Sequence, residues 1–529
     1  MIENLINQAA AGLPLWLPDL RERFAKQPGA DRLIIRLCDG RETARDWELS
    51  LPFAQNGEEQ AFILRFVTSQ IYNLLSAYSA CEVILYCEER EAKLYSDLPA
   101  LFDRPDGLGK VRNIARRICG GFSIRFAPIS SYSLAVTVSP AEAPDLGEKL
   151  RSLCRAAEGK GCVGIDIGGS DIKLAVSSGK ELLHVEEYDW NPAASRTADE
   201  ILDPILQLIK KAKTLLERSG ASLDAVGISF PDIVINDRIV GGETPKTKGM
   251  RDNPAIDYER EFARLRELKA EVLPLCASNG FVRLTNDGNM AAFTAAVELA
   301  AGAMDAQIDG GVIAHSLGTD LGTGWLEADG SIPAIPLEMY DLLLDLGDLP
   351  SAALPPEDLR SSRNENSAMN GVRRYLGQAA AYRLAWNLDP SLLDGFVERK
   401  GELLVVPTSP EDLRKPCLEQ LMRFAASGNG AAEEIFRQIG RNLSVVAREM
   451  NWIFRKTPPL RFLFGRFVKS RRCFELLCEG FDEAGTGIRL EIADEELANT
   501  ALMRALSDMP GVTLAQFAQA IGSIYFAFS

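Results

Sequence analysis

Acidic residues beside short glycine clusters are the first candidates for chemistry in this chain. The stretch 161–177 reads GCVGIDIGGSDIKLAVS, so an apolar run leads to Asp166 and then to a turn at Gly168, Gly169 and Ser170. Alternating apolar residues on both sides of a glycine pair predict strand, turn and strand. Glycines at such a tip let backbone N–H groups contact an anion, and a nearby carboxylate suits hydrated Mg²⁺. Taken alone, a plain hairpin and a phosphate loop are about equally supported.

A second carboxylate lies at the end of a predicted strand. The apolar run 281–285 is followed by the letters NDGN, which contain Asp287, and an alanine-rich helix is expected over 290–301. A carboxylate between a strand and a helix lies at the mouth of an α/β sheet, where ligands usually bind. These four residues alone would be interpreted as an Asx cap on the helix.

A second glycine-rich turn follows. After a strand expected at 310–314, residues 315–324 read HSLGTDLGTG, and a short strand is expected at 325–327. His315 leads into this turn and is interpreted as structural rather than catalytic. Two phosphate-loop candidates separated by a strand, a carboxylate and a helix form a far more specific pattern than any one of them.

Composition narrows the class of protein. The 529 residues carry a formal net charge of −16, which disfavours nucleic acid as a partner. Ten scattered cysteines and two histidines do not form the spacing of a zinc site, and they favour unpaired thiols in a reducing compartment. The first residues lack a signal-peptide pattern and no long apolar run occurs, so we expect a cytoplasmic protein without a membrane partner.

The first 140 residues are expected to form a separate α+β domain. Val111–Cys119, a predicted helix, carries three arginines that could meet an anion, although a solvated helix face is favoured. The function of this domain is not readable from the sequence, and 141–160 is interpreted as a linker containing a short helix. The other elements expected here are strands at 32–38, 81–87, 122–126 and 133–139 and a helix at 57–80.

The remaining elements alternate as in an α/β protein. A polar loop at 243–252 is interpreted either as the lining of a substrate cleft or as ordinary surface. Strands are expected at 182–188, 225–230, 460–464 and 488–492, a hairpin at 233–242, and helices at 197–219, 369–386, 410–426, 429–454, 468–479, 495–507 and 514–527.

Residues 160–529 resemble the ROK family of sugar kinases, within the actin, Hsp70 and hexokinase superfamily. The resemblance rests on a set of motifs rather than on one. DIGGSDIKLAV (166–176) and LGTDLGTG (317–324) are similar to the two phosphate motifs, and TNDGN (285–289) to the catalytic element. LFGRFV (463–468) is similar to the adenosine motif, and AQAIGSIYFA (518–527) to the closing helix.

The chain departs from this family in two places. The family's Gly-Glu-x-Gly-His element is reduced to LEMYD at 337–341, so its histidine is missing, and the cysteine-rich zinc motif is absent. The adenosine motif keeps one glycine, Gly465, beside Arg466, where the family prefers two glycines. The first departure leaves the sugar unnamed and removes the expectation of zinc, and the second bears on the choice of nucleotide.

The resemblance implies an α/β fold of two ribonuclease-H-like lobes flanking a cleft, joined to the N-terminal α+β domain. Lobe 1 is expected at 161–302, with the terminal helix 514–529 packing back on it, and lobe 2 at 303–513. The implied activity is ATP-dependent phosphorylation of a hydroxyl on a sugar, with Mg²⁺ held through water by Asp166. The implied catalytic base is Asp287; the sugar ligands are Asn286, Asn289, Glu338, Pro231 and Asp232; and the ATP or phosphate ligands are Asp166, Gly168, Gly169, Ser170, Lys173, Gly318, Thr319, Gly322, Gly324 and Gly465.

Two alternatives from other classes remain open on the sequence. The chain could be a non-catalytic nucleotide- or sugar-binding regulator, because the same fold serves repressors, but no winged-helix pattern precedes the lobes. It could also be an ATPase related to actin or Hsp70, but the NDGN element favours the sugar-kinase branch. The resemblance allows a homodimer, with a small-molecule sugar as the substrate.

Overall fold

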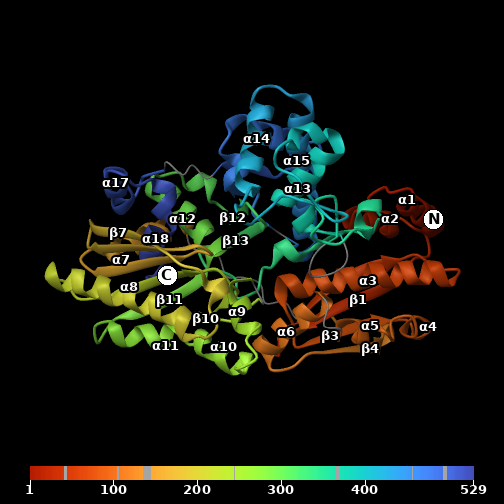
Figure 1. Cartoon of the computed structure of the whole chain (residues 1–529). Coiled ribbons are helices and arrows are strands. Elements are labelled where there is room, and N and C mark those ends of the chain that lie inside the picture. The colour runs from red at the N-terminus through yellow and green to blue at the C-terminus, as the bar shows by residue number, and fades with distance from the viewer. Residues whose placement is uncertain are drawn as a thin grey trace.

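The fold is described from a computed structural model. It describes residues 1–40, 44–103, 107–134, 145–242, 245–363, 370–455, 457–492 and 497–529. Most of the strand expected at 133–139, the first residues of the loop at 243–252 and the first residues of the helix expected at 495–507 lie outside the described residues. In Figure 1 the first lobe lies at the left, the N-terminal segment at the right, and helices α13 to α15 at the top.

The first lobe is built on a mixed five-stranded sheet in the order β11-β8-β5-β6-β7. Strand β6 runs antiparallel to both β5 and β7, whereas β8 pairs parallel with β5 and β11 pairs parallel with β8. This order is the ribonuclease-H-like arrangement. The strands are β5 Gly161–Ile167, β6 Asp171–Ser178, β7 Glu181–Asp189, β8 Ala225–Phe230 and β11 Phe281–Asn286.

The second lobe repeats this arrangement with one strand fewer. Its sheet has the order β13-β12-β18-β19, with β12 and β13 antiparallel and with β18 and β19 parallel to β12. The two sheets confirm the predicted two-lobed α/β fold. The strands are β12 Gly311–Leu317, β13 Leu321–Glu327, β18 Leu460–Phe464 and β19 Arg489–Ile492.

The helices between the two sheets pack so closely that glycine is needed at their contact points. A Cβ on Gly164 of β5 would lie 1.9 Å from the carbonyl oxygen of Ala520, and one on Gly522 would lie 1.9 Å from Oγ1 of Thr294. Glycine is therefore required where these helices meet the sheet and each other. The helices are α12 Asp287–Ala301, α18 Leu514–Phe526 and α7 Leu146–Ala157, and α7, which lies in the segment interpreted as a linker, packs against the other two.

The N-terminal segment has its own four-stranded sheet but shares its apolar core with the second lobe. Phe24 and Phe66 belong to the same buried cluster as Phe436 and Leu443 of α15. The indole nitrogen of Trp47 also donates to the carbonyl of α15 residue 453 at 3.0 Å. The sheet order is β2-β1-β3-β4, and the elements are α1 Ile2–Ala10, α2 Leu17–Ala25, β1 Asp31–Cys38, β2 Ala44–Leu51, α3 Gly57–Tyr78, β3 Glu82–Cys87, α4 Glu89–Ala92, α5 Leu98–Phe102, α6 Gly107–Cys119 and β4 Ser123–Pro128.

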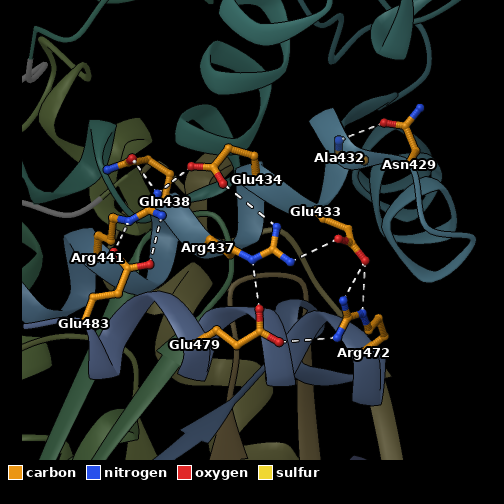
Figure 2. A network of polar contacts seen from close by, with 10 residues as sticks. All are labelled: Asn429, Ala432, Glu433, Glu434, Arg437, Gln438, Arg441, Arg472, Glu479 and Glu483. Atoms are coloured by element: carbon orange, nitrogen blue, oxygen red, sulfur yellow. Dashed lines mark hydrogen bonds and ion pairs between the residues drawn. The ribbon is translucent and has the colours of Figure 1, made fainter.

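Four helices cover the outer face of the second lobe, and two of them are joined by ion pairs (Figure 2). Arg437 of α15 lies 2.8 Å from Glu479 of α16, and Arg441 lies 2.6 Å from Glu483. Exposed pairs of this kind contribute about 0–1 kcal/mol each, so the buried apolar faces hold the helices together. The four are α13 Gln378–Leu388, α14 Arg414–Ala426, α15 Gly430–Phe454, which Asn429 caps, and α16 Arg471–Asp482.

Several element boundaries differ from the sequence predictions. The helix expected from residue 369 begins at Gln378, because Asn370–Gly371 pairs as a strand with Leu343–Asp345. Within the described residues 497–507 of the helix expected at 495–507, the helix α17 covers Ala501–Ser507 and is capped by Thr500. The remaining elements are α8 Asp199–Arg218, β9 Val234–Ile235, β10 Arg238–Ile239, α9 Lys248–Arg251, α10 Tyr258–Arg266, α11 Leu268–Val272, β14 Leu343–Asp345, β15 Asn370–Gly371, β16 Glu398–Lys400 and β17 Leu403–Val405.

Candidate active site

A cavity of about 450 Å³ lies between the lobes and collects many of the predicted site residues. A larger one of about 560 Å³ lies between α2 and α15, but its arginines, Arg21 and Arg448, are already paired with carboxylates. Because the charges of the larger cavity are already paired, the inter-lobe cavity is the better candidate for an active site. The predicted residues that line it are Pro231, Asn286, Asp287, Gly318, Thr319, Gly322 and Glu338.

Asp287 lies at the junction of β11 and α12. Asn286 caps the helix, because its side-chain oxygen accepts a hydrogen bond from Gly288 N at 2.8 Å. One oxygen of Asp287, Oδ1, also accepts from Gly288 N at 2.8 Å. The residue that caps α12 is thus Asn286, and Asp287 is the first residue of the helix. The carboxylate of Asp287 therefore lies at the positively polarised N-terminal end of α12.

Asn289 and Asp232 support this junction from the sides. The side-chain oxygen of Asn289 accepts from Trp325 N at 3.0 Å, which fixes α12 to β13. Asp232 accepts from the backbone N–H groups of Ile233 and Gly242 and is buried. Both predicted sugar ligands are therefore bound to backbone groups next to the cavity and do not line it.

The first glycine turn is set back from the cavity. Its N–H at Gly168 closes the hairpin on the carbonyl of Asp171 at 2.8 Å, and Lys173 pairs with the Asp171 side chain. Asp166 accepts from the hydroxyl of Ser229 at 2.7 Å. Burial, with a smaller contribution from the negative charge of Asp287, raises the pKa of Asp166 to about 6. Gly168, Gly169, Ser170, Lys173 and Asp166 are absent from the lining of the cavity.

The second glycine turn forms one wall of the cavity. Nothing lies within 4 Å of a Cβ placed on Gly318, so its backbone faces open space. Gly324 differs, because a Cβ there would lie 1.8 Å from the carbonyl oxygen of Gly288 at the start of α12. Gly465 has φ +92° and meets the carbonyl oxygen of Leu317. The structure thus gives Gly324 and Gly465 packing contacts, whereas Gly318 is accessible.

Several cavity residues escaped the sequence analysis. Lys246 lines the cavity, and its Nζ donates to the carbonyl of Pro231 at 2.9 Å. A Cβ on Gly169 would lie 3.8 Å from Cε of Lys246, so this lysine connects the first turn with the cavity. Lys246 belongs to the polar loop that was one candidate for a cleft lining. Arg373 and Tyr340 also line the cavity; Tyr340 lies in the diverged element at 337–341 but was given no role there, and no local signal marked Arg373.

A buried histidine lies behind the second turn. Nδ1 of His315 lies 3.0 Å from Oγ1 of Thr323, and its Nε2 lies 3.1 Å from the guanidinium of Arg461. All three side chains are buried. Arginine can only donate, so Nε2 accepts and the proton of the neutral ring is on Nδ1. Burial and the nearby arginine lower the pKa of His315 well below its ordinary value, which agrees with a neutral ring.

Two properties of the described part of the chain bear on metals and membranes. Within it, no group of three or more His, Cys, Asp or Glu side chains is arranged to hold a metal ion. Each helix that the structure describes is too short or too polar to cross a bilayer.

Comparisons with known proteins were made for the whole chain. No protein-family model and no curated protein matches it. Similar solved structures include a ROK family glucokinase from Streptomyces griseus in complex with glucose and AMPPNP (19% identity, TM-score 0.39, covering 69% of this chain and 99% of that one). They also include a ROK hexokinase from Thermus thermophilus (17%, 0.41, 70% and 98%) and a ROK family transcriptional regulator, a homolog of the E. coli MLC protein (14%, 0.41, 70% and 81%). A fold does not by itself determine a function, so function is argued from the site.

Proposed function

We propose that this protein transfers the γ-phosphoryl group of ATP to a hydroxyl of a sugar or sugar derivative. One observation carries the proposal. Asp287, at the N-terminus of α12, shares one cavity with the backbone of the second glycine turn and with the carboxylate of Glu338. A base, a phosphate-binding wall and a hydroxyl-binding carboxylate are the parts that such a transfer requires.

In the proposed reaction, Asp287 accepts the proton of the acceptor hydroxyl as that oxygen bonds to the γ-phosphorus. The bond from this phosphorus to the bridging oxygen breaks, and ADP leaves with that oxygen. Gly318 and Gly322 present backbone at the phosphates, and Lys246 supplies positive charge between the two turns. Glu338 accepts a hydrogen bond from a sugar hydroxyl, because buried hydroxyls need partners.

Mg²⁺ fits the acidic groups at this site. Asp166 and Asp287 are close enough for the charge of one to raise the pKa of the other, and Mg²⁺ is commonly held by one or two carboxylates together with substrate phosphates. Asp166 would hold the ion through water. The ion, when bound, neutralises the charge of the phosphates.

The test is ATP consumption by the purified protein with a panel of sugars. We expect ADP formation that depends on an added sugar and falls about 10²–10⁴-fold in D287N, the range for loss of a general base. Asp309 is an exposed aspartate outside the site, so D309N is the matched control. ADP formation at the same rate with and without sugar would indicate an ATPase. Sugar binding without turnover would indicate a regulator.

A further inference from the structure

The loop that carries Glu338 is held by the N-terminal segment. The backbone N–H groups of Leu337 and Glu338 donate to the carbonyls of Ala77 and Ser76, at the C-terminal end of α3, at 3.1 and 3.0 Å. Leu337 has φ +55°, a conformation that costs a non-glycine residue about 1 kcal/mol or more. The contacts with α3 therefore maintain a strained backbone beside the cavity.

Helix α6 of the same segment adds a buried cation to this loop. Nζ of Lys110 lies 2.8 Å from the hydroxyl of Tyr340 and 3.7 Å from Oε2 of Glu338, and it also pairs with Asp341. Lys110 is 9% exposed and Asp341 is 1% exposed. Two cations lie near the tyrosine ring, with Lys110 at 4.8 Å and Arg373 at 4.7 Å from its centroid.

The chemistry of these groups fixes the direction of their hydrogen bonds. An ammonium group can only donate, so the hydroxyl oxygen of Tyr340 accepts from Lys110. The hydroxyl hydrogen of Tyr340 then goes to Oε2 of Glu338. Burial and the nearby carboxylates raise the pKa of Tyr340 well above its ordinary value, so it keeps this proton. Among the described residues, none donates a hydrogen bond to the other oxygen, Oε1, although Glu338 lines the cavity.

Charges around Glu338 come from several elements. Its pKa is raised to about 7, mainly by burial and also by the charges of Asp341 and Asp232, while Lys110 from α6 opposes the rise. Arg373 lies near Asp341, with 3.6 Å between its Nε and an aspartate oxygen. Lys246 contributes positive charge at Asp232. Lys110 is the cation that most directly favours the ionised form of Glu338.

We propose that Lys110 is a positioning residue of the acceptor site, which acts through Tyr340 to hold one oxygen of Glu338 and turn the other toward a hydroxyl of a polyol acceptor. This inference rests on the proposed function for the identity of the ligand. It assigns the N-terminal segment a part in the site, because residues far from the lobes in sequence then determine how tightly the acceptor binds. The two hydrogen bonds from Lys110 to Tyr340 and from Tyr340 to Glu338, called the relay below, do not depend on whether the protein is a kinase.

The kinetic test uses K110M, Y340F and the double variant. Each single change is expected to raise the acceptor KM about tenfold, since a hydrogen bond to a charged group contributes about 1.5–3 kcal/mol. The double variant should lose little more than either single one, because both changes break the same relay. The KM for ATP should stay within about twofold. R116M is the matched control, because Arg116 is an exposed cation on the same helix. Additive losses, or an equal rise in the KM for ATP, would overturn the proposal.

A second measurement does not require activity. Stability is followed from pH 5 to 9 by urea unfolding of wild type, E338Q, K110M and R116M. The pH-dependent step that disappears in E338Q belongs to Glu338, and K110M should move it to higher pH while R116M leaves it in place. An unmoved step in K110M would overturn the relay even if the protein is a kinase. A moved step in a protein that phosphorylates no sugar would retain the relay and reject the proposed function.

Discussion

Gly168 and Gly318 begin turns that are built alike. Each lies between two antiparallel strands, and its N–H donates to the backbone carbonyl of an aspartate, at 2.8 Å to Asp171 and at 3.1 Å to Asp320. Their surroundings differ. The second turn lines the cavity and is held by α13, whose Gln378 N–H donates to the carbonyl of Gly318 at 3.0 Å. The first turn meets the cavity through Lys246. In the proposed function, phosphate contact would therefore be direct at the second turn and through Lys246 at the first.

The largest expected effect separates the glycines of the second turn. G324A would force a methyl group against the carbonyl of Gly288, so we expect it to lower the free energy of unfolding by about 3 kcal/mol, at the upper end of overpacking penalties. G318A meets open space and should unfold like wild type, while any loss of phosphate contact appears in the KM for ATP. Urea unfolding measures the first effect. Equal stability of G324A and G318A would contradict this difference in packing between the two glycines.

A somewhat smaller effect concerns Asp166 beside the first turn. Its folded-state pKa of about 6 lies above the ordinary value of 3.8, so the folded state binds the proton more tightly. Wild type should lose stability relative to D166N as pH rises from 4 to 6, by about 1–3 kcal/mol. The comparison is made by urea unfolding at matched pH values. Parallel curves for the two proteins would contradict the assignment.

Lys246 tests the proposed link between the turns. K246M removes the cation between Gly169 and the cavity, and we expect kcat to fall about tenfold, because one charge-assisted contact to the transferring group is lost. The exposed Lys93, on the far N-terminal segment, supplies the control K93M. If K246M changes only the sugar KM, Lys246 serves the acceptor and not the phosphoryl group.

The smallest expected effect is that the ring of His315 does not titrate. His315 should remain neutral with its proton on Nδ1, so its ring ¹⁵N signals should not move between pH 5 and 8. The chain has two histidines, and H184Q leaves His315 as the single histidine signal. A protonated ring in this range would mean that Arg461 does not donate to it.

Local signals explain why much of the fold could be predicted. The strands at 225–230 and 460–464 are short apolar runs, and their bounds match β8 and β18. Glycine turns can also be recognised in the sequence, because three or four consecutive residues are enough to form them. Asp287 and Gly318 were expected at a common cleft because their motifs resemble those of one family, and both line the cavity between the lobes. Their proposed roles stay predictions.

Long-range contacts explain the rest. Lys110 and Tyr340 are 230 positions apart in the chain and meet through tertiary packing alone. Arg117 was expected on a solvated helix face, yet its side chain lies against Gly241 and Glu259 of the first lobe. An amphipathic helix shows which residues are polar, but not which of them another element will cover.

The shared core of the N-terminal segment has a consequence for the order of folding. Residues 1–134 leave the ribosome before α15, but the apolar faces of α2 and α3 are completed by α15, which begins at Gly430. Domains generally fold as units during synthesis, and a unit cannot close before its last part is made. We therefore expect nascent chains that end before Phe454 to expose these faces and to bind holdase chaperones, in a proteolysis-sensitive state that ends only when α15 has been made.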